Sequence, residues 1–153
     1  MSLSAAIAAI ASAVRMTPGV VYTPDSPPDQ LSDFEFPAVI IFPLRGDHNL
    51  ATAYGGNGLP VESKHVTLRM DLHVRQYTED LDDLVVIAVA ANELLSKKVW
   101  RAFLDNRLNN QVMQMGTENT APIRWTFGTM SWGGQDTIGF TYELDITTME
   151  DIP

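Results

Sequence analysis

The sequence predicts an α+β fold in which a mostly antiparallel sheet of about four strands packs against two helices. Two segments have the apolar spacing of helices and four have that of strands, in the order helix, strand, strand, helix, strand, strand. Helices and strands that do not alternate regularly are typical of this class. Because 153 residues is the usual length of one domain, we expect a single domain over 1–153.

The first part of the chain predicts one helix, one irregular connection and one strand. Residues 3–15 have apolar side chains at helical spacing, and Ser2 or Ser4 can cap this helix. Three prolines make 22–33 an irregular connection. The apolar run 36–42 predicts a strand that is covered on both faces, and prolines near its ends place it at a sheet edge or limit its pairing.

Residues 44–63 contain four glycines and a proline, and they predict a long loop. Loops of about this length inside a compact domain are usually functional or become ordered on binding. We therefore expect polar side chains of this loop to contact a partner. The candidates are Arg45, Asp47, His48, Asn49 and Tyr54.

Residues 64–77 give the clearest strand pattern, because apolar and polar side chains alternate from Val66 to Val74. We expect the aliphatic face to be buried and the polar face to be solvated. His65 and Asp71 lie roughly 20 Å apart along such a strand, too far to share a metal ion. The polar face supplies the second set of candidate contact residues, and Arg69→Glu is expected to weaken assembly while the monomer stays folded. This set is Arg69, Asp71, His73 and Arg75.

A long helix follows, capped by Thr78, with acidic residues in its first turn and an end near Phe103 or Leu104. The Asn- and Gln-rich residues 105–121 predict a surface connection. The apolar positions expected to face the core are Leu81, Leu84, Val85, Ala88, Ala91, Leu95 and Val99.

The last two predicted strands, 123–132 and 137–148, flank Gly133-Gly134, which is a hairpin turn signal. Trp132 falls on the opposite face of its strand from Trp125 and Phe127. We therefore expect at least one of these rings to be available to a partner. The side chains of the last strand expected to face inward are Ile138, Phe140, Tyr142, Leu144 and Ile146, with Gly139, Thr141, Glu143, Asp145 and Thr147 facing outward.

The composition argues against several classes of function. The chain has no cysteine, which excludes disulfides, thiolate metal sites and cysteine nucleophiles. Its net charge of −9 argues against gripping the nucleic-acid backbone. The apolar stretch 3–14 lacks the basic residues that precede a signal peptide core, and no run approaches the ~20 residues of a membrane span. We expect a soluble protein made in the cytoplasm, with no cofactor, metal or catalytic residue.

The order of elements, together with four local motifs, resembles the tail terminator proteins of long-tailed, lambda-like bacteriophages. The motifs are an acidic-Phe-Pro-Ala-Val start of the first strand (35–39), a polar-aliphatic strand (66–74), a helix opened by acidic residues (79–84) and a final strand of alternating Thr, Tyr and acidic residues (140–146). Each motif is short, and it is their order along most of the chain that carries the resemblance.

The resemblance implies a structural virion protein that is not an enzyme and lies in the tail of the virion. Such a protein forms a hexameric ring on the last ring of tail-tube subunits. The ring stops tube polymerisation and joins the head-tail connector, while DNA passes through its centre. Two alternatives stay open: a tail completion or connector protein of the same assembly, and a small enzyme or ligand-binding α+β domain. The latter requires a concave apolar pocket with convergent titratable groups.

Overall fold

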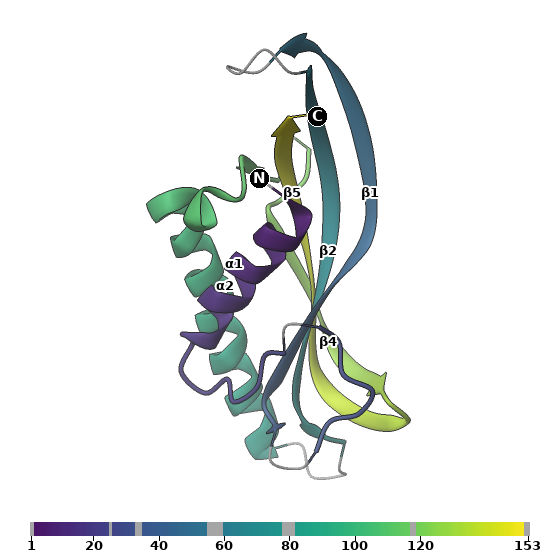
Figure 1. Cartoon of the computed structure of the whole chain (residues 1–153). Coiled ribbons are helices and arrows are strands. Elements are labelled where there is room, and N and C mark those ends of the chain that lie inside the picture. Colours follow the sequence, from purple (N-terminus) through teal and green to yellow (C-terminus); the bar gives the residue numbers. More distant parts are fainter. Residues whose placement is uncertain are drawn as a thin grey trace.

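The computed structural model describes residues 2–24, 26–32, 35–54, 60–77, 82–116 and 119–151. Over these residues the fold is α+β, as the sequence predicts, with both helices on one face of the sheet (Figure 1). The helices are α1 (Leu3–Arg15) and α2 (Asp82–Asn110), and the strands are β1 (Ala38–Tyr54), β2 (Pro60–Gln76), β3 (Gln114–Met115), β4 (Ile123–Trp132) and β5 (Gln135–Asp151).

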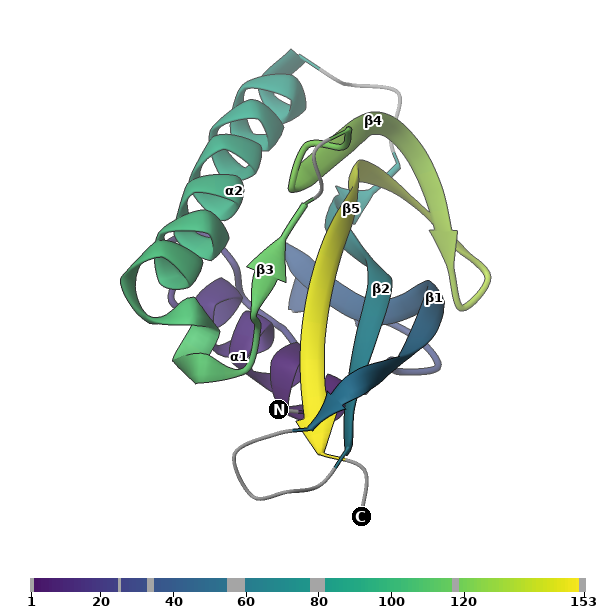
Figure 2. The same cartoon turned by 90° about the horizontal axis from the view of Figure 1, so that it is seen from above.

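The sheet is antiparallel, and β2 and β5 form its centre. β1 pairs with the edge of β2 that is not paired with β5. On the opposite edge of β5, β4 and the short β3 pair with successive parts of the strand. Figure 2 shows the strong twist of these long strands. Among the described residues, β1 is the edge strand on one side, with Tyr22 bridged to Ala38 at its start, and β4 and the short β3 form the other edge. For β1, nearby prolines predicted an edge position or limited pairing, and the edge position is found.

The main core lies between the helices and the sheet. The side chains of α1 that face it include Ile10 and Val14, and those of α2 include Leu95 and Val99. Ser2 begins α1, because its hydroxyl accepts a hydrogen bond from the Ala5 amide. All the predicted inward-facing residues of the two central strands are buried, which confirms both alternating patterns. They are Val66, Leu68, Met70, Leu72 and Val74 on β2 and Ile138, Phe140, Tyr142, Leu144 and Ile146 on β5.

A second, smaller core covers part of the opposite face of the sheet. Leu31 from the proline-rich connection packs there against Ala38 and Ile40 of β1, with Trp132 of β4 at its margin. The Trp132 indole Nε1 donates a hydrogen bond of 2.7 Å to the carbonyl oxygen of Pro28. This contact and its neighbours fasten the connection across the sheet, so both faces are covered at this end.

The predicted loop 44–63 is wrong over 44–54 and 60–63, because these residues continue β1 and begin β2. The two strands stay paired from Arg45 opposite Thr67 to Leu50 opposite Glu62. A register shift between Pro43 and Arg45 changes which side chains share a face, so the apolar alternation of the first part of β1 does not continue. Residues 55–59 lie outside the described part of the chain.

The expected cap and first turn of α2, 78–81, also lie outside the described residues. The backbone leaves helical geometry at Asn106, close to the predicted end, and Arg107 to Asn110 all have positive φ. In the predicted stripe Ala88, Leu95 and Val99 are buried, whereas Val85 is exposed and that part of the prediction is wrong. Ala91 is half-buried against the core, and the side chains of Leu81 and Leu84 are not described.

The predicted surface connection 105–121 is wrong in part. Leu108 and Val112 are buried in the main core, and β3 adds two residues to the sheet within this segment. The predicted hairpin, in contrast, is confirmed. Gly133 and Gly134 have φ of 58° and 79°, the left-handed values that a two-residue hairpin turn requires and that glycine adopts without strain.

Candidate interaction surfaces

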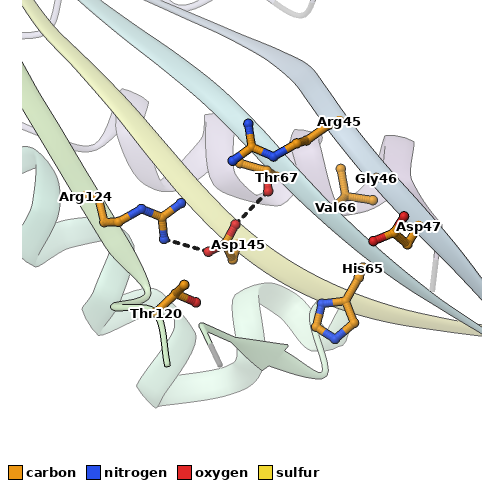
Figure 3. A pocket seen from close by; sticks show the side chains of 9 residues that line it. All are labelled: Arg45, Gly46, Asp47, His65, Val66, Thr67, Thr120, Arg124 and Asp145. Carbon is orange, nitrogen blue, oxygen red and sulfur yellow. Dashed lines mark hydrogen bonds and ion pairs between the residues drawn. The ribbon is translucent and has the colours of Figure 1, made fainter. Parts of the chain in front are cut away.

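Ionic side chains line the part of the sheet's outer face that the second core leaves open. Arg124 of β4 lies at the centre of this charged cluster, with Nη1 2.6 Å from Asp145 and Nη2 3.4 Å from Glu143. The Thr67 hydroxyl donates a hydrogen bond of 2.7 Å to the other oxygen of Asp145 (Figure 3). Arg45 of β1 approaches Glu143 at 3.8 Å. Four strands are thus linked through polar side chains on this face.

A shallow pocket of about 280 Å³ opens beside this cluster, and Asp47 and His65 also line it (Figure 3). Burial raises the pKa of the Asp145 carboxyl, but the hydrogen bonds from Arg124 and Thr67 outweigh it and hold the pKa below its usual value. The same bond to Asp145 raises the pKa of the Arg124 guanidinium. These charges largely compensate one another, so the pocket is suited to polar contact.

Within the described residues, no group of three or more His, Asp or Glu side chains could hold a metal ion. Neither described helix is long and apolar enough to span a membrane.

The five candidates from the predicted loop all lie on β1. Arg45 and Asp47 are exposed at the charged pocket, as expected of contact residues. The backbones of His48 and Asn49 pair with Lys64 and Ser63, and the backbone of Tyr54 pairs with Pro60. The side chains of these three residues lie outside the described part of the structure.

The four candidates on β2 do not form a solvated face. The prediction is wrong for the two middle residues, Asp71 and His73. Asp71 is 2% exposed and His73 is fully buried, because the second core covers this stretch of the strand. Neither has surface to offer a partner. Arg69 and Arg75 are partly exposed and lie at the border of the covered region.

His73 occupies a closely packed environment. Its Nδ1 lies 2.6 Å from the hydroxyl of Thr137, and its ring lies 6.2 Å from that of Trp132. Its Nε2 has no hydrogen-bond partner among the described residues. Burial lowers the pKa of the imidazole; the carboxylate of Asp71 opposes that effect and Arg69 adds to it. Burial at this position therefore favours the neutral imidazole in the folded protein.

β4 presents aromatic side chains to solvent on the helix side of the sheet. Trp125 is 53% exposed and Phe127 is 43% exposed. Trp125 packs edge-on and Phe127 packs at a tilt against Phe140 of β5, with centroid distances of 5.3 and 5.0 Å. The expectation that at least one aromatic ring of this hairpin is exposed is therefore confirmed, whereas Trp132 on the other face is half-buried.

α2 carries a second apolar surface, which the sequence analysis did not single out. Val86 is 72% exposed and Val89 is 55% exposed, and Ile87 between them is also exposed. The signal was present in residues 84–91, which are all apolar. A helix that is apolar on all sides is normally covered on all sides, yet this one has only one side against the core.

The arrangement defines an α+β protein with a charged face, sheet edges at β1 and β4, and apolar side chains exposed on β4 and α2. A scan against models of protein families gives no match for this chain, and a search of curated proteins gives no match either.

Proposed function

We propose that the protein is a tail terminator of a long-tailed bacteriophage. It forms a ring, most simply a hexamer, that caps the tail tube, stops tube polymerisation and provides the surface for joining the head. The proposal rests first on the sequence resemblance described above. Apart from the short β3, the antiparallel α+β fold has the element order on which that resemblance depends, which supports the proposal.

The two edge strands support ring formation. A closed ring needs two unlike surfaces on each copy, one for each neighbour. β1 and β4 lie at opposite sides of the sheet, and because each neighbouring pair in the order β1, β2, β5, β4 is antiparallel, they run in opposite directions. When β4 of one copy meets β1 of the next head to tail, the two strands are antiparallel and their unpaired backbone groups can bond.

The single structural observation that carries the proposed contact between copies is the exposure of Trp125 and Phe127 on the edge strand β4. Aromatic residues are enriched in the cores of protein interfaces, where a large apolar ring is buried at a low cost in side-chain entropy. No charged side chain lies between these two residues along the strand. In the proposed oligomer, the neighbouring copy covers both aromatic side chains.

The overall charge is consistent with passage of DNA. Lys and Arg number 10 against 19 Asp and Glu. A predominantly negative channel wall repels the phosphate backbone and so keeps the DNA from adhering as it moves. The expected protein partners are the tail-tube protein on one side of the ring and the head-tail connector on the other.

Native mass spectrometry over a range of concentrations, with negative-stain microscopy, tests the proposal. We expect the wild-type protein to form a closed ring, alone or on tail-tube subunits. The double variant Trp125→Ser, Phe127→Ser should lose the ring and keep its fold, whereas Tyr77→Ser, which changes another half-exposed aromatic residue, should keep the ring. A wild-type protein that stays monomeric both alone and with tube subunits would overturn the proposal.

The same measurement separates the alternatives. A tail completion or connector protein would assemble on the head side and would not limit the length of growing tubes. A small ligand-binding domain would remain a monomer or dimer in every mixture with tube subunits.

A further inference from the structure

The two halves of α2 carry opposite charge. Asp82 and Asp83 stand at its start, and in its second half the cations Lys97, Lys98 and Arg101 outnumber Glu93 and Asp105, so the opposite charge is a net charge. The intervening residues 84–92 are uncharged. The chain has ten Lys and Arg in total, so three of them are concentrated within five positions of one helix.

The side of α2 that points away from the sheet has the spacing of a helix-packing seam. Ala88, Leu95 and Val99 face the core, and the exposed positions on the other side follow one another at intervals of three and four residues. This spacing keeps a stripe of side chains facing a second helix. The exposed stripe is Ile87, Ala90, Leu94, Lys97, Arg101 and Leu104.

The second half of this stripe contains a groove of about 430 Å³ with an apolar floor and a basic rim. Leu94, Trp100 and Leu104 line it together with the three cations. Lys97 and Arg101 form ion pairs with Glu93 and Asp105 one helical turn away, and every one of these four side chains is more than half exposed. Such exposed pairs are weak, so the cations can exchange partners at little cost.

We propose that α2 packs against α2 of a second copy, with the two helices antiparallel about a two-fold axis that passes close to Ala90 and Leu94. In this arrangement the acidic, valine-rich half of each helix lies on the basic groove of the other, and the same contact is made twice. Antiparallel packing also places the positive end of each helix dipole beside the negative end of its partner.

The occupant is a second copy because one outward stripe of α2 carries both charges: Asp83, four residues before Ile87, lies in line with Lys97 and Arg101. A head-to-tail neighbour would need the two halves to point in different directions, whereas a two-fold partner needs them on the same side, as they are here. The contact is distinct from the proposed ring interface at the sheet edges. It would join two free copies, or two rings face to face, and its modest apolar area makes it concentration-dependent.

Single cysteines test the axis directly, because the chain has none of its own. Near a two-fold axis a residue meets its own equivalent, and a disulfide forms when the two Cα atoms are within about 4.4–6.8 Å. We expect Ala90→Cys or Leu94→Cys to form a covalent dimer under mild oxidation at least tenfold faster than Met16→Cys. Met16 is the control because it is 73% exposed and lies at the end of α1. Equal rates for all three variants would overturn the proposal.

Charge reversal gives an independent test. The acidic variant carries Lys97→Glu, Lys98→Glu and Arg101→Glu, and the basic variant carries Asp82→Lys and Asp83→Lys. Each alone should lose the α2 contact in light scattering, and an equal mixture should regain it as a one-to-one pair. Persistence of the contact in the acidic variant alone, or no recovery in the mixture, would contradict the pairing.

Failure of this inference and failure of the proposed ring are distinguishable. With Ala90→Cys added, the Trp125→Ser, Phe127→Ser protein should no longer show a particle of the mass of the ring, but it should still form the disulfide-linked dimer through α2. The acidic variant should keep the ring mass and lose the cross-link, together with any particle of twice the ring mass.

Discussion

Arg69 and Asp71 face the same side of β2, and Nε of Arg69 lies 2.9 Å from Oδ1 of Asp71. The carboxylate is buried, whereas the guanidinium remains partly exposed and lies over the ring of Phe42 at 5.4 Å. Arg69 is thus the counter-ion of a buried charge at the border of the second core. This role in holding the fold differs from the interface role that the sequence pattern suggests.

Arg69→Glu is therefore expected to destabilise the folded monomer. A buried carboxylate that loses its partner and gains a negative neighbour is costly, and because Arg69 is partly exposed we expect a loss of about 1–3 kcal/mol. Urea unfolding of the isolated protein measures it. Arg45→Glu is the matched control, because the Arg45 side chain is mostly exposed. Its closest approach to Glu143 is 3.8 Å, which is a long and therefore weak ion pair. Equal stability of the two variants would contradict this role of Arg69.

Gly139→Ala should disrupt the centre of the sheet. A Cβ at Gly139 would lie 1.8 Å from the carbonyl oxygen of Leu72 on the neighbouring strand, so backbone must move. We expect a loss of at least about 3 kcal/mol, at the upper end of the range for overpacking. Gly128→Ala is the control, since Gly128 pairs with Gly139 across the β4–β5 ladder and a Cβ there meets nothing within 4 Å. Thermal unfolding of both variants decides the point.

Acid should destabilise the protein through His73. Burial lowers the pKa of this imidazole in the folded state from its ordinary value of 6.5. Below pH 6.5 the unfolded chain therefore binds a proton that the folded protein does not bind. This contribution is fully present above pH 6.5 and is lost as the pH falls, at up to about 1.4 kcal/mol per pH unit, until the folded pKa is reached.

Urea unfolding between pH 7.5 and pH 5.5 checks this expectation. His73→Gln, which stays neutral throughout, should flatten the dependence of the unfolding free energy on pH, even if the variant is less stable at every pH. His65→Gln, on the same strand, controls for the loss of a histidine as such. A wild-type stability that is constant over this range would contradict the assignment.

Trp132→Phe should loosen the proline-rich connection. The substitution keeps an aromatic ring near Phe42, whose centroid lies 5.9 Å from that of Trp132, but removes the hydrogen bond to Pro28. We expect a loss of about 1 kcal/mol. Hydrogen exchange at the Leu31 amide, which donates to the side chain of Gln135, should become faster while exchange in β2 is unchanged. Unaltered exchange at Leu31 would show that the bond does not hold this segment.

The sequence was informative where one strand face packs against helices. The alternation in β2 and β5 and the Gly133-Gly134 turn each reflect local geometry, and each is found in the structure. The α+β class follows from the same patterns. These features do not depend on which distant segments come into contact, so the local sequence pattern is sufficient to predict them.

Features that depend on distant segments were not predictable. Asp71 and His73 alternate as solvated residues do, but Leu31 and Trp132, far away in the sequence, help to cover this face of the sheet. The continuation of β1 past Pro43 depends on pairing with β2, because residues 45–49 are polar or glycine and give no apolar alternation. The exposed side of α2 was missed because an apolar run predicts burial and does not indicate what covers it.

The position of β5 at the centre of the sheet determines when, during synthesis, the chain can complete its fold. β5 is synthesised after every other described element of this chain, yet β2 and β4 both pair with it. Pairing between β2 and β5 also closes long loops, which slows folding. Until β5 has been translated, neither the aromatic surface of β4 nor the seam of α2 has a scaffold. In the proposed assembly, incomplete chains would thereby be excluded, and only finished copies could join.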